Sequence, residues 1–223
     1  MKSAAEIGFI FDWDGVVVDS SKQHEESWEL LAKQENQVLP TGHFKKGFGK
    51  KNEWIMRNVL QWTDQTAEIS RLGEEKERLY RDIVRKTGLD PLPGVKQFIE
   101  EFQSQGYRAA VGSSTPKANI LAVLEITGLN GLLADIVAAE DVEIGKPNPA
   151  VFIKAAKLVG LPPEKCVVFE DSLGGIEAGL ASGAKVVGVT TTNPEEILRD
   201  AGVGLVVDSF EEISVERMLA LFE

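Results

Sequence analysis

Short apolar runs alternate along most of the chain with longer stretches in which apolar residues recur every three or four positions. The first run ends at Phe11 and is typical of a buried strand. The amphipathic stretches have helical spacing, as in Val95, Phe98, Ile99 and Phe102. Five further strands are predicted at residues 108–111, 135–138, 166–169, 185–189 and 205–207. Strands that alternate with helices in this way predict an α/β fold with a doubly wound, mostly parallel sheet.

Residues from about 20 to 87 break this alternation. They contain no convincing strand and predict helices at 24–34, 51–61 and 66–85. We therefore expect residues 1–19 and 88–223 to form the core and residues 20–87 to form an inserted helical cap, with hinges near 19–21 and 87–92. Later helices should begin where a capping residue precedes a proline at the first helical position, as in Thr115-Pro116, Asn148-Pro149 and Asn193-Pro194.

Composition narrows the classes of partner. A chain of 223 residues can bury a core without disulfides or a structural metal. The net charge of −11 argues against nucleic acid, because nucleic-acid binding needs a basic surface. The single cysteine, Cys166, precedes apolar residues and is interpreted as a strand residue rather than a reactive thiol. No apolar run is long enough for a transmembrane helix, and Asp12 and Asp14 interrupt any signal-peptide core. We expect a cytoplasmic protein with no membrane partner, either a monomer or a weak homodimer.

Polar side chains follow the ends of the predicted strands, which is where open α/β sheets bind ligands. Asp12 and Asp14 follow the first strand, and Gly15 permits a sharp exit from it. The later strands are followed by Ser113, Lys146, Glu170 and Asp171. Because the carboxyl ends of parallel strands lie at one edge of the sheet, these groups should converge. Carboxylates, a hydroxyl donor and a lysine are the groups that phosphoryl transfer needs.

This pattern resembles the haloacid dehalogenase superfamily, in particular its members with a helical cap inserted after the first motif. The four motifs of that family are matched in order by Asp12-Trp13-Asp14-Gly15, Ser113, Lys146-Pro147 and Glu170-Asp171. A helix rich in small residues follows, in which Gly174 and Gly175 are interpreted as sites of close packing. The resemblance covers essentially the whole chain. It implies a Rossmann-like catalytic core, a Mg²⁺ cofactor and a small phosphorylated metabolite as substrate.

The resemblance also implies a role for each matched residue. Asp12 would attack phosphorus to form an aspartyl-phosphate, and Asp14 would protonate the leaving oxygen and later deprotonate the attacking water. Ser113 would donate to the phosphoryl group, while Lys146 would pair with it and hold Asp12 ionised. The metal ligands would be the backbone carbonyl of Asp14 and the carboxylates of Asp12, Asp171 and Glu170. Glu170 could instead accept hydrogen bonds next to the metal ligands without binding the metal itself.

Residues of the predicted cap are assigned to substrate binding. Four lysines surround two glycines at residues 45–51, and we interpret this segment as a substrate loop with Lys46 and Lys50 pointing inward. His24 lies on the first cap helix, at a position similar to that of a cap histidine in the sugar-phosphate mutases of the family. Lys76 lies on the last cap helix, also at a position similar to one in those mutases. The cap core is predicted to contain Trp28, Trp54 and Trp62.

The leading function is a Mg²⁺-dependent phosphatase that acts on a sugar phosphate or phosphoglycolate. The alternative is a phosphomutase similar to β-phosphoglucomutase. Two substitutions weaken that alternative: Lys50 replaces an arginine, which would grip phosphate with two parallel hydrogen bonds, and Lys117 replaces an amide. A third hypothesis is a non-enzymatic, phosphate-responsive protein that resembles a receiver domain, which the helical insert argues against. Asp14 argues against both dehalogenation and phosphonate cleavage.

Overall fold

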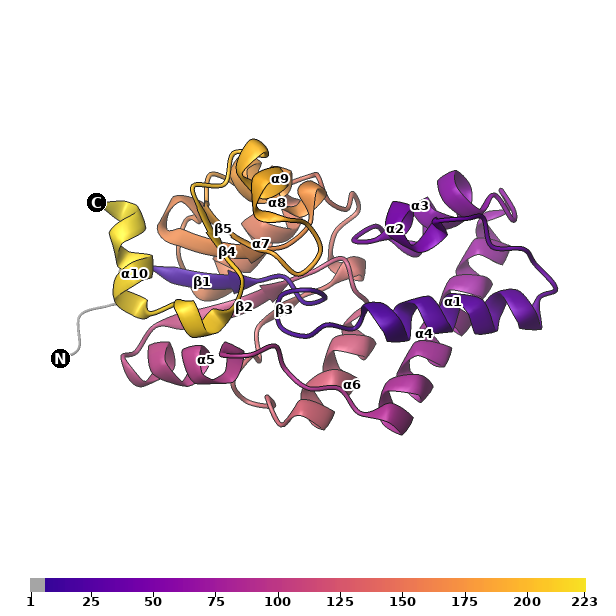
Figure 1. Cartoon of the computed structure of the whole chain (residues 1–223), viewed down its shortest axis with the longest axis horizontal. Helices are drawn as coiled ribbons and strands as arrows, with labels where there is room; N and C mark the ends of the chain where they lie inside the picture. Colours follow the sequence, from indigo (N-terminus) through magenta and orange to yellow (C-terminus); the bar gives the residue numbers. More distant parts are fainter. Residues whose placement is uncertain (1–6) are drawn as a thin grey trace.

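A six-stranded parallel sheet forms the centre of the computed structural model, which describes residues 7–223. The strand order is β3-β2-β1-β4-β5-β6, so that the first strand of the chain is central (Figure 1). Its neighbours β2 and β4 place Val111 and Phe169 opposite Phe11. The strands are β1 (Gly8–Phe11), β2 (Arg108–Gly112), β3 (Ile136–Val137), β4 (Cys166–Glu170), β5 (Lys185–Val189) and β6 (Leu205–Val207). The predicted doubly wound α/β core is confirmed.

Helices cover both faces of this sheet. One face carries α5 (Val95–Ser104), α6 (Lys117–Thr127) and α10 (Val215–Leu219), and the other carries α7 (Ala150–Val159), α8 (Leu173–Ser182) and α9 (Glu195–Asp200). Successive side chains of a strand point to opposite faces. Phe9 and Phe11 of β1 therefore pack against Phe98 and Phe169 on the first face, whereas Ile10 packs on the second. Burial on both faces explains why β1 is a continuous apolar run.

The cap is helical and lies beyond the carboxyl end of the sheet (Figure 1). It contains α1 (Ser21–Gln34), α2 (His43–Gly47), α3 (Asn52–Ile55) and α4 (Thr66–Thr87). The helix predicted at 51–61 is α3 followed by a π-helical turn at Met56–Leu60. The two segments that connect the cap to the core run side by side, because Val18 forms a β-bridge with Pro91. Trp28 belongs to the buried cap core and Trp62 packs against it. The prediction for Trp54 was wrong: this residue is 42% exposed.

The three predicted helix starts are shifted by one residue. The helices begin after the proline, at Lys117, Ala150 and Glu195. Asn148 does accept a hydrogen bond from the backbone N–H of Ala150, at 3.0 Å. Thr115 was wrongly predicted as a cap, since its hydroxyl donates instead to the carboxylate of Asp14. At this position the polar residue before the proline, Thr115, is therefore part of the candidate site rather than a helix cap.

Candidate active site

The paired aspartates lie in a tight turn at the end of β1. Asp12 continues the ladder, donating its backbone N–H to the carbonyl of Phe169 at 3.0 Å. The chain then reverses, and Gly15 adopts a φ of 83°, which glycine tolerates without strain. A Cβ atom at Gly15 would lie 2.0 Å from Asp171 Oδ2. Glycine is therefore required both by the turn and by the close approach of the second acidic motif.

Lys146 holds the first aspartate. Its Nζ lies 2.9 Å from Asp12 Oδ1 and 2.5 Å from Glu170 Oε1, and all three side chains are buried. Burial alone would lower the pKa of Lys146, but the two carboxylates outweigh it and raise the pKa above its ordinary value. The lysine is therefore charged. Burial raises the pKa of Asp12 to about 7, against the opposing effect of Lys146.

Glu170 and Asp171 differ in how their oxygens are occupied. Glu170 Oε1 accepts from Lys146, and Oε2 accepts from the backbone N–H groups of Asp171 and Ser172, both at 2.9 Å. Asp171 Oδ2 accepts from the Thr192 hydroxyl, while its Oδ1 is buried with no hydrogen-bond partner in residues 7–223. The free ligand position therefore lies on Asp171, whereas Glu170 mainly orients its neighbours.

Three carboxylates surround a position that suits a divalent cation. Ligand oxygens from Asp12, Glu170 and Asp171 all lie within 4.8 Å of one another. Apart from the ion pair with Lys146, Asp12 Oδ1 has no hydrogen-bond partner in the described chain. Burial and the neighbouring carboxylates raise the pKa of Asp171 well above its ordinary value, the sign of unbalanced negative charge. Mg²⁺ prefers a few carboxylate oxygens together with water and phosphate oxygens, so this donor set fits it.

Asp14 points away from this cluster. Its carboxylate accepts hydrogen bonds from the hydroxyls of Ser20 and Thr115, and Oδ1 lies 3.4 Å from His24 Nε2. Burial would raise the pKa of Asp14, but His24 and the two hydroxyls outweigh burial and lower it to about 2. Ser113 is buried nearby and lines the same cavity. The side chain of Asp14 is thus free of the metal position and faces the space between core and cap.

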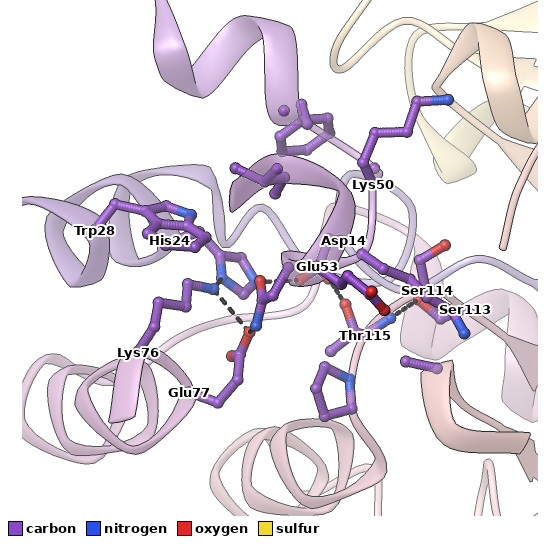
Figure 2. A pocket seen from close by; sticks show the side chains of 18 of the residues that line it. Asp14, His24, Trp28, Lys50, Glu53, Lys76, Glu77, Ser113, Ser114 and Thr115 are labelled. Carbon is purple, nitrogen blue, oxygen red and sulfur yellow. Dashed lines mark hydrogen bonds and ion pairs between the residues drawn. The ribbon is translucent and has the colours of Figure 1, made fainter. Parts of the chain in front are cut away.

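A cavity of about 570 Å³ separates these core residues from the cap. His24 and Lys76 line it and contact one another, with Lys76 Nζ 2.6 Å from His24 Nδ1 (Figure 2). Lys50 also lines it, although its amine points away from His24 and lies 5.6 Å from the centre of the Trp54 ring. Lys46 is exposed and is not among the lining residues, so the structure does not bring it to the cavity.

Comparison with known proteins agrees with this geometry. Residues 8–183 match the family model described as "haloacid dehalogenase-like hydrolase". The chain belongs to this hydrolase family. It is 31% identical over 214 residues to hexitol phosphatase A of Escherichia coli, a match that covers 94% of each protein. Its fold superposes with a TM-score of 0.83 on β-phosphoglucomutase from Clostridium difficile, which is 25% identical; the match covers 98% of this chain and 96% of the mutase.

A second relative is the chloroplastic 5-amino-6-(5-phospho-D-ribitylamino)uracil phosphatase of Arabidopsis thaliana, 31% identical over 212 residues. That match covers 94% of this chain, which spans 56% of the length of the plant protein. By their names, these relatives are two phosphatases and a phosphoglucomutase. This family member is therefore similar to enzymes of the phosphatase and phosphomutase type. Within residues 7–223, none of its helices combines the length and apolar character needed to cross a bilayer.

Several residues of this hydrolase that support the site were not predicted. The hydroxyls of Ser20 and Thr115 bind Asp14, and that of Thr192 binds Asp171. Asn193, expected to cap a helix, donates its side-chain N–H to the Asp171 carbonyl at 2.9 Å. Thr192 follows the end of β5, so the rule that strand ends carry ligand-binding groups would have found it.

Of the two glycines after the acidic pair, Gly175 is a site of close packing as expected, and its close neighbour is a carboxylate of the site. A Cβ atom at Gly175 would lie 1.7 Å from Glu170 Oε1, so this glycine makes room for a carboxylate of the site. Gly179, one turn further along α8, does pack closely on the sheet, because a Cβ there would lie 2.8 Å from a methyl carbon of Val186. The small-residue helix thus serves both the site and the core.

Proposed function

We propose that this enzyme is a Mg²⁺-dependent phosphatase that hydrolyses a small phosphomonoester through an aspartyl-phosphate on Asp12. The observation that carries the proposal is the pairing of Asp12 with Lys146 beside an unpartnered oxygen of Asp171. A buried carboxylate held by a lysine and facing a cation position is equipped to attack phosphorus. When bound, Mg²⁺ would neutralise charge on the phosphoryl group, held by Asp12, Asp171 and the Asp14 carbonyl.

Asp14 supplies the proton transfers. The negative charge of a bound phosphoryl group raises the pKa of a nearby carboxyl, which favours the protonated form of Asp14. Asp12 attacks phosphorus, the bond to the leaving oxygen breaks, and Asp14 passes its proton to that oxygen. A water molecule then attacks the phosphoryl group on Asp12 and loses its proton to Asp14. Inorganic phosphate leaves, and Asp12 is regenerated.

The cap side of the cavity favours a neutral leaving group. Four glutamates line the cavity together with three lysines, and two of those lysines already have partners. Lys51 donates to the Val142 carbonyl at 2.6 Å, and Lys76 contacts Glu77. Among the described residues that line the cavity, a second phosphate would therefore meet carboxylates, with Lys50 as the lysine left to bind it. This arrangement supports a phosphatase over a mutase, whose bisphosphate intermediate needs a site for a distal phosphate.

A phosphorylated polyol fits this compartment. The Nδ1 of His43 lies 3.2 Å from the Pro40 carbonyl. Its buried Nε2, which has no hydrogen-bond partner within residues 7–223, is therefore left as an acceptor at the cavity wall. Carboxylates and this nitrogen are acceptors for hydroxyl groups. Two relatives, a hexitol phosphatase and a ribitylamino-uracil phosphatase, are also named after compounds that contain a polyol chain. We therefore extend the proposal to phosphomonoesters of small polyols and sugars.

Product analysis tests this proposal. Sorbitol 6-phosphate, glucose 6-phosphate and phosphoglycolate are each incubated with enzyme and Mg²⁺, and released phosphate is measured. We expect release that EDTA abolishes, fastest with the polyol phosphate. In parallel, β-glucose 1-phosphate with a trace of glucose 1,6-bisphosphate is followed by phosphorus NMR. Inorganic phosphate as the main product supports the phosphatase, and stoichiometric glucose 6-phosphate would establish the mutase instead.

A further inference from the structure

Three consecutive residues of the loop after β5 bind the acidic motif and the turn beside it. Thr192 donates its hydroxyl to Asp171 Oδ2. Asn193 donates its side-chain N–H to the backbone carbonyl of Asp171 at 2.9 Å. Thr191 donates its hydroxyl to the backbone carbonyl of Gly15. This loop therefore fixes both the backbone and the carboxylate of Asp171.

The two carboxylate oxygens of Asp171 have different surroundings. The whole residue is buried. Its Oδ2 accepts the Thr192 hydroxyl and also lies against Gly15, where an added Cβ atom would be only 2.0 Å away. Its Oδ1 has no hydrogen-bond partner within residues 7–223. One oxygen of this carboxylate is therefore open to a cation, whereas the other is held by the protein.

The neighbouring glutamate is restricted more strongly. Glu170 Oε1 lies 2.5 Å from Lys146 Nζ, and Oε2 accepts from the backbone N–H groups of Asp171 and Ser172. Neither carboxylate of the acidic pair thus has both oxygens available. Ca²⁺ takes about six to eight oxygen ligands and often binds a carboxylate through both oxygens, whereas Mg²⁺ takes one or two carboxylates and keeps several waters. A site of few, single oxygens matches Mg²⁺.

We infer that Thr192 is a positioning residue that makes Asp171 bind the cation through one oxygen, and that it thereby favours Mg²⁺ over Ca²⁺. This inference rests on the proposed Mg²⁺ site. The Thr192 hydroxyl keeps Oδ2 in a hydrogen bond and fixes the orientation of Oδ1. Without the hydroxyl, the carboxylate is free to turn and to offer both oxygens. A further ligand and a more flexible site help Ca²⁺, whereas Mg²⁺ needs near-ideal octahedral geometry.

Metal binding to the substrate-free enzyme tests this inference independently of turnover. Thr192→Val removes the hydroxyl and nearly keeps the shape of the side chain. Thermal melts at increasing MgCl2 or CaCl2 give a Kd for each ion from the rise in Tm. We expect the Kd for Mg²⁺ to rise by at least about tenfold, and the Kd for Ca²⁺ to rise by less than about threefold or to fall. Thr192→Ser keeps a hydroxyl and should leave both constants within about threefold of their wild-type values.

A neighbouring threonine provides the matched control. Thr190 donates its hydroxyl to Asp208 at 2.6 Å in an exposed contact, so Thr190→Val should change neither constant. If Thr192→Val melts far below the wild type in EDTA, Thr192→Ala provides the same comparison. Similar rises of both constants in the variants that lack the Thr192 hydroxyl, or the same change of selectivity in Thr190→Val, would overturn the inference. If Mg²⁺ neither raises the Tm of the wild type nor supports turnover, the proposed function is overturned instead.

Discussion

The core half and the cap half of the candidate active site are built differently. In the core, the carboxylates are held by dense sets of short contacts: Glu170 accepts from Lys146 and from two backbone N–H groups, and Asp14 accepts from two hydroxyls. On the cap side of the cavity, the Lys50 amine rests over an exposed tryptophan, and His43 Nε2 has no partner in the described chain. The core is therefore preorganised for charge, whereas the cap leaves donors and acceptors open for a leaving group.

This difference indicates which half of the site sets substrate specificity. Phosphoryl transfer needs positioned charges that do not rearrange during the reaction, and a preorganised core supplies them. Recognition of the leaving group needs polar atoms that the protein does not satisfy by itself. Substitutions in the core should consequently remove activity with every substrate, while substitutions in the cap should change the ranking of substrates.

Asp12→Asn should have the largest effect. It keeps the volume of the side chain but removes the nucleophile, and we expect kcat to fall by at least about a thousandfold, or about 4 kcal/mol of barrier. The measurement is phosphate release with polyol and aryl phosphates, with circular dichroism to check the fold. A variant that keeps more than about a tenth of the wild-type rate with either substrate would remove Asp12 from the nucleophile role.

Substitutions of Glu170 and of Asp171 should differ in how far they weaken Mg²⁺ binding. Asp171→Asn changes the carboxylate with a free buried oxygen, so the Mg²⁺ concentration for half-maximal activity should rise by more than about a hundredfold. Glu170→Gln should raise it by about tenfold, because Glu170 acts mainly through Lys146 and the following backbone. Activity titrated with Mg²⁺ provides the comparison. Equal shifts would show that both residues ligate directly.

The cap lysines should show smaller and unequal effects. Lys50→Ala is expected to raise KM by up to about fivefold with little change in kcat, as for a partly exposed charge worth up to about 1 kcal/mol. Lys46 does not line the cavity, so Lys46→Ala serves as a matched control and should leave both constants unchanged. A larger rise in KM for Lys46→Ala than for Lys50→Ala would restore the inward orientation that the sequence predicted for Lys46.

The smallest expected effect is on stability in the absence of metal. The pKa of Asp12 is raised from 3.8 to about 7, so the folded state binds this proton more tightly than the unfolded chain. Its contribution to stability is present below about pH 4 and is lost as pH rises toward about 7. In EDTA at pH 8, Asp12→Asn should therefore raise Tm by a few degrees, and at pH 4 the difference should vanish. Thermal melts at both values check this, and a lower Tm for the variant at pH 8 would contradict it.

Prediction from sequence worked where local pattern and chain direction suffice. The strands that end near Asp12, Ser113 and Glu170 form the predicted sheet, and Lys146 contacts Asp12 as expected. Prediction failed where one residue type serves two purposes. A threonine before a proline is a typical helix cap, yet Thr115 binds Asp14 because the turn after β1 brings that carboxylate within reach.

The sequence alone predicts which edge of the sheet carries the candidate site. Apolar periodicity sets the parallel strands, and parallel strands bring polar residues at their carboxyl ends together whatever the loops between them do. Only the tertiary structure decided which groups complete the site. Thr192 donates to Asp171, and Asn119 donates to Glu77, although the two residues of each pair are far apart in the sequence. The first contact depends on how the loops after β4 and β5 pack within the core, and the second depends on how the cap docks on the core. Both are set by packing between surfaces rather than by any local pattern along the chain.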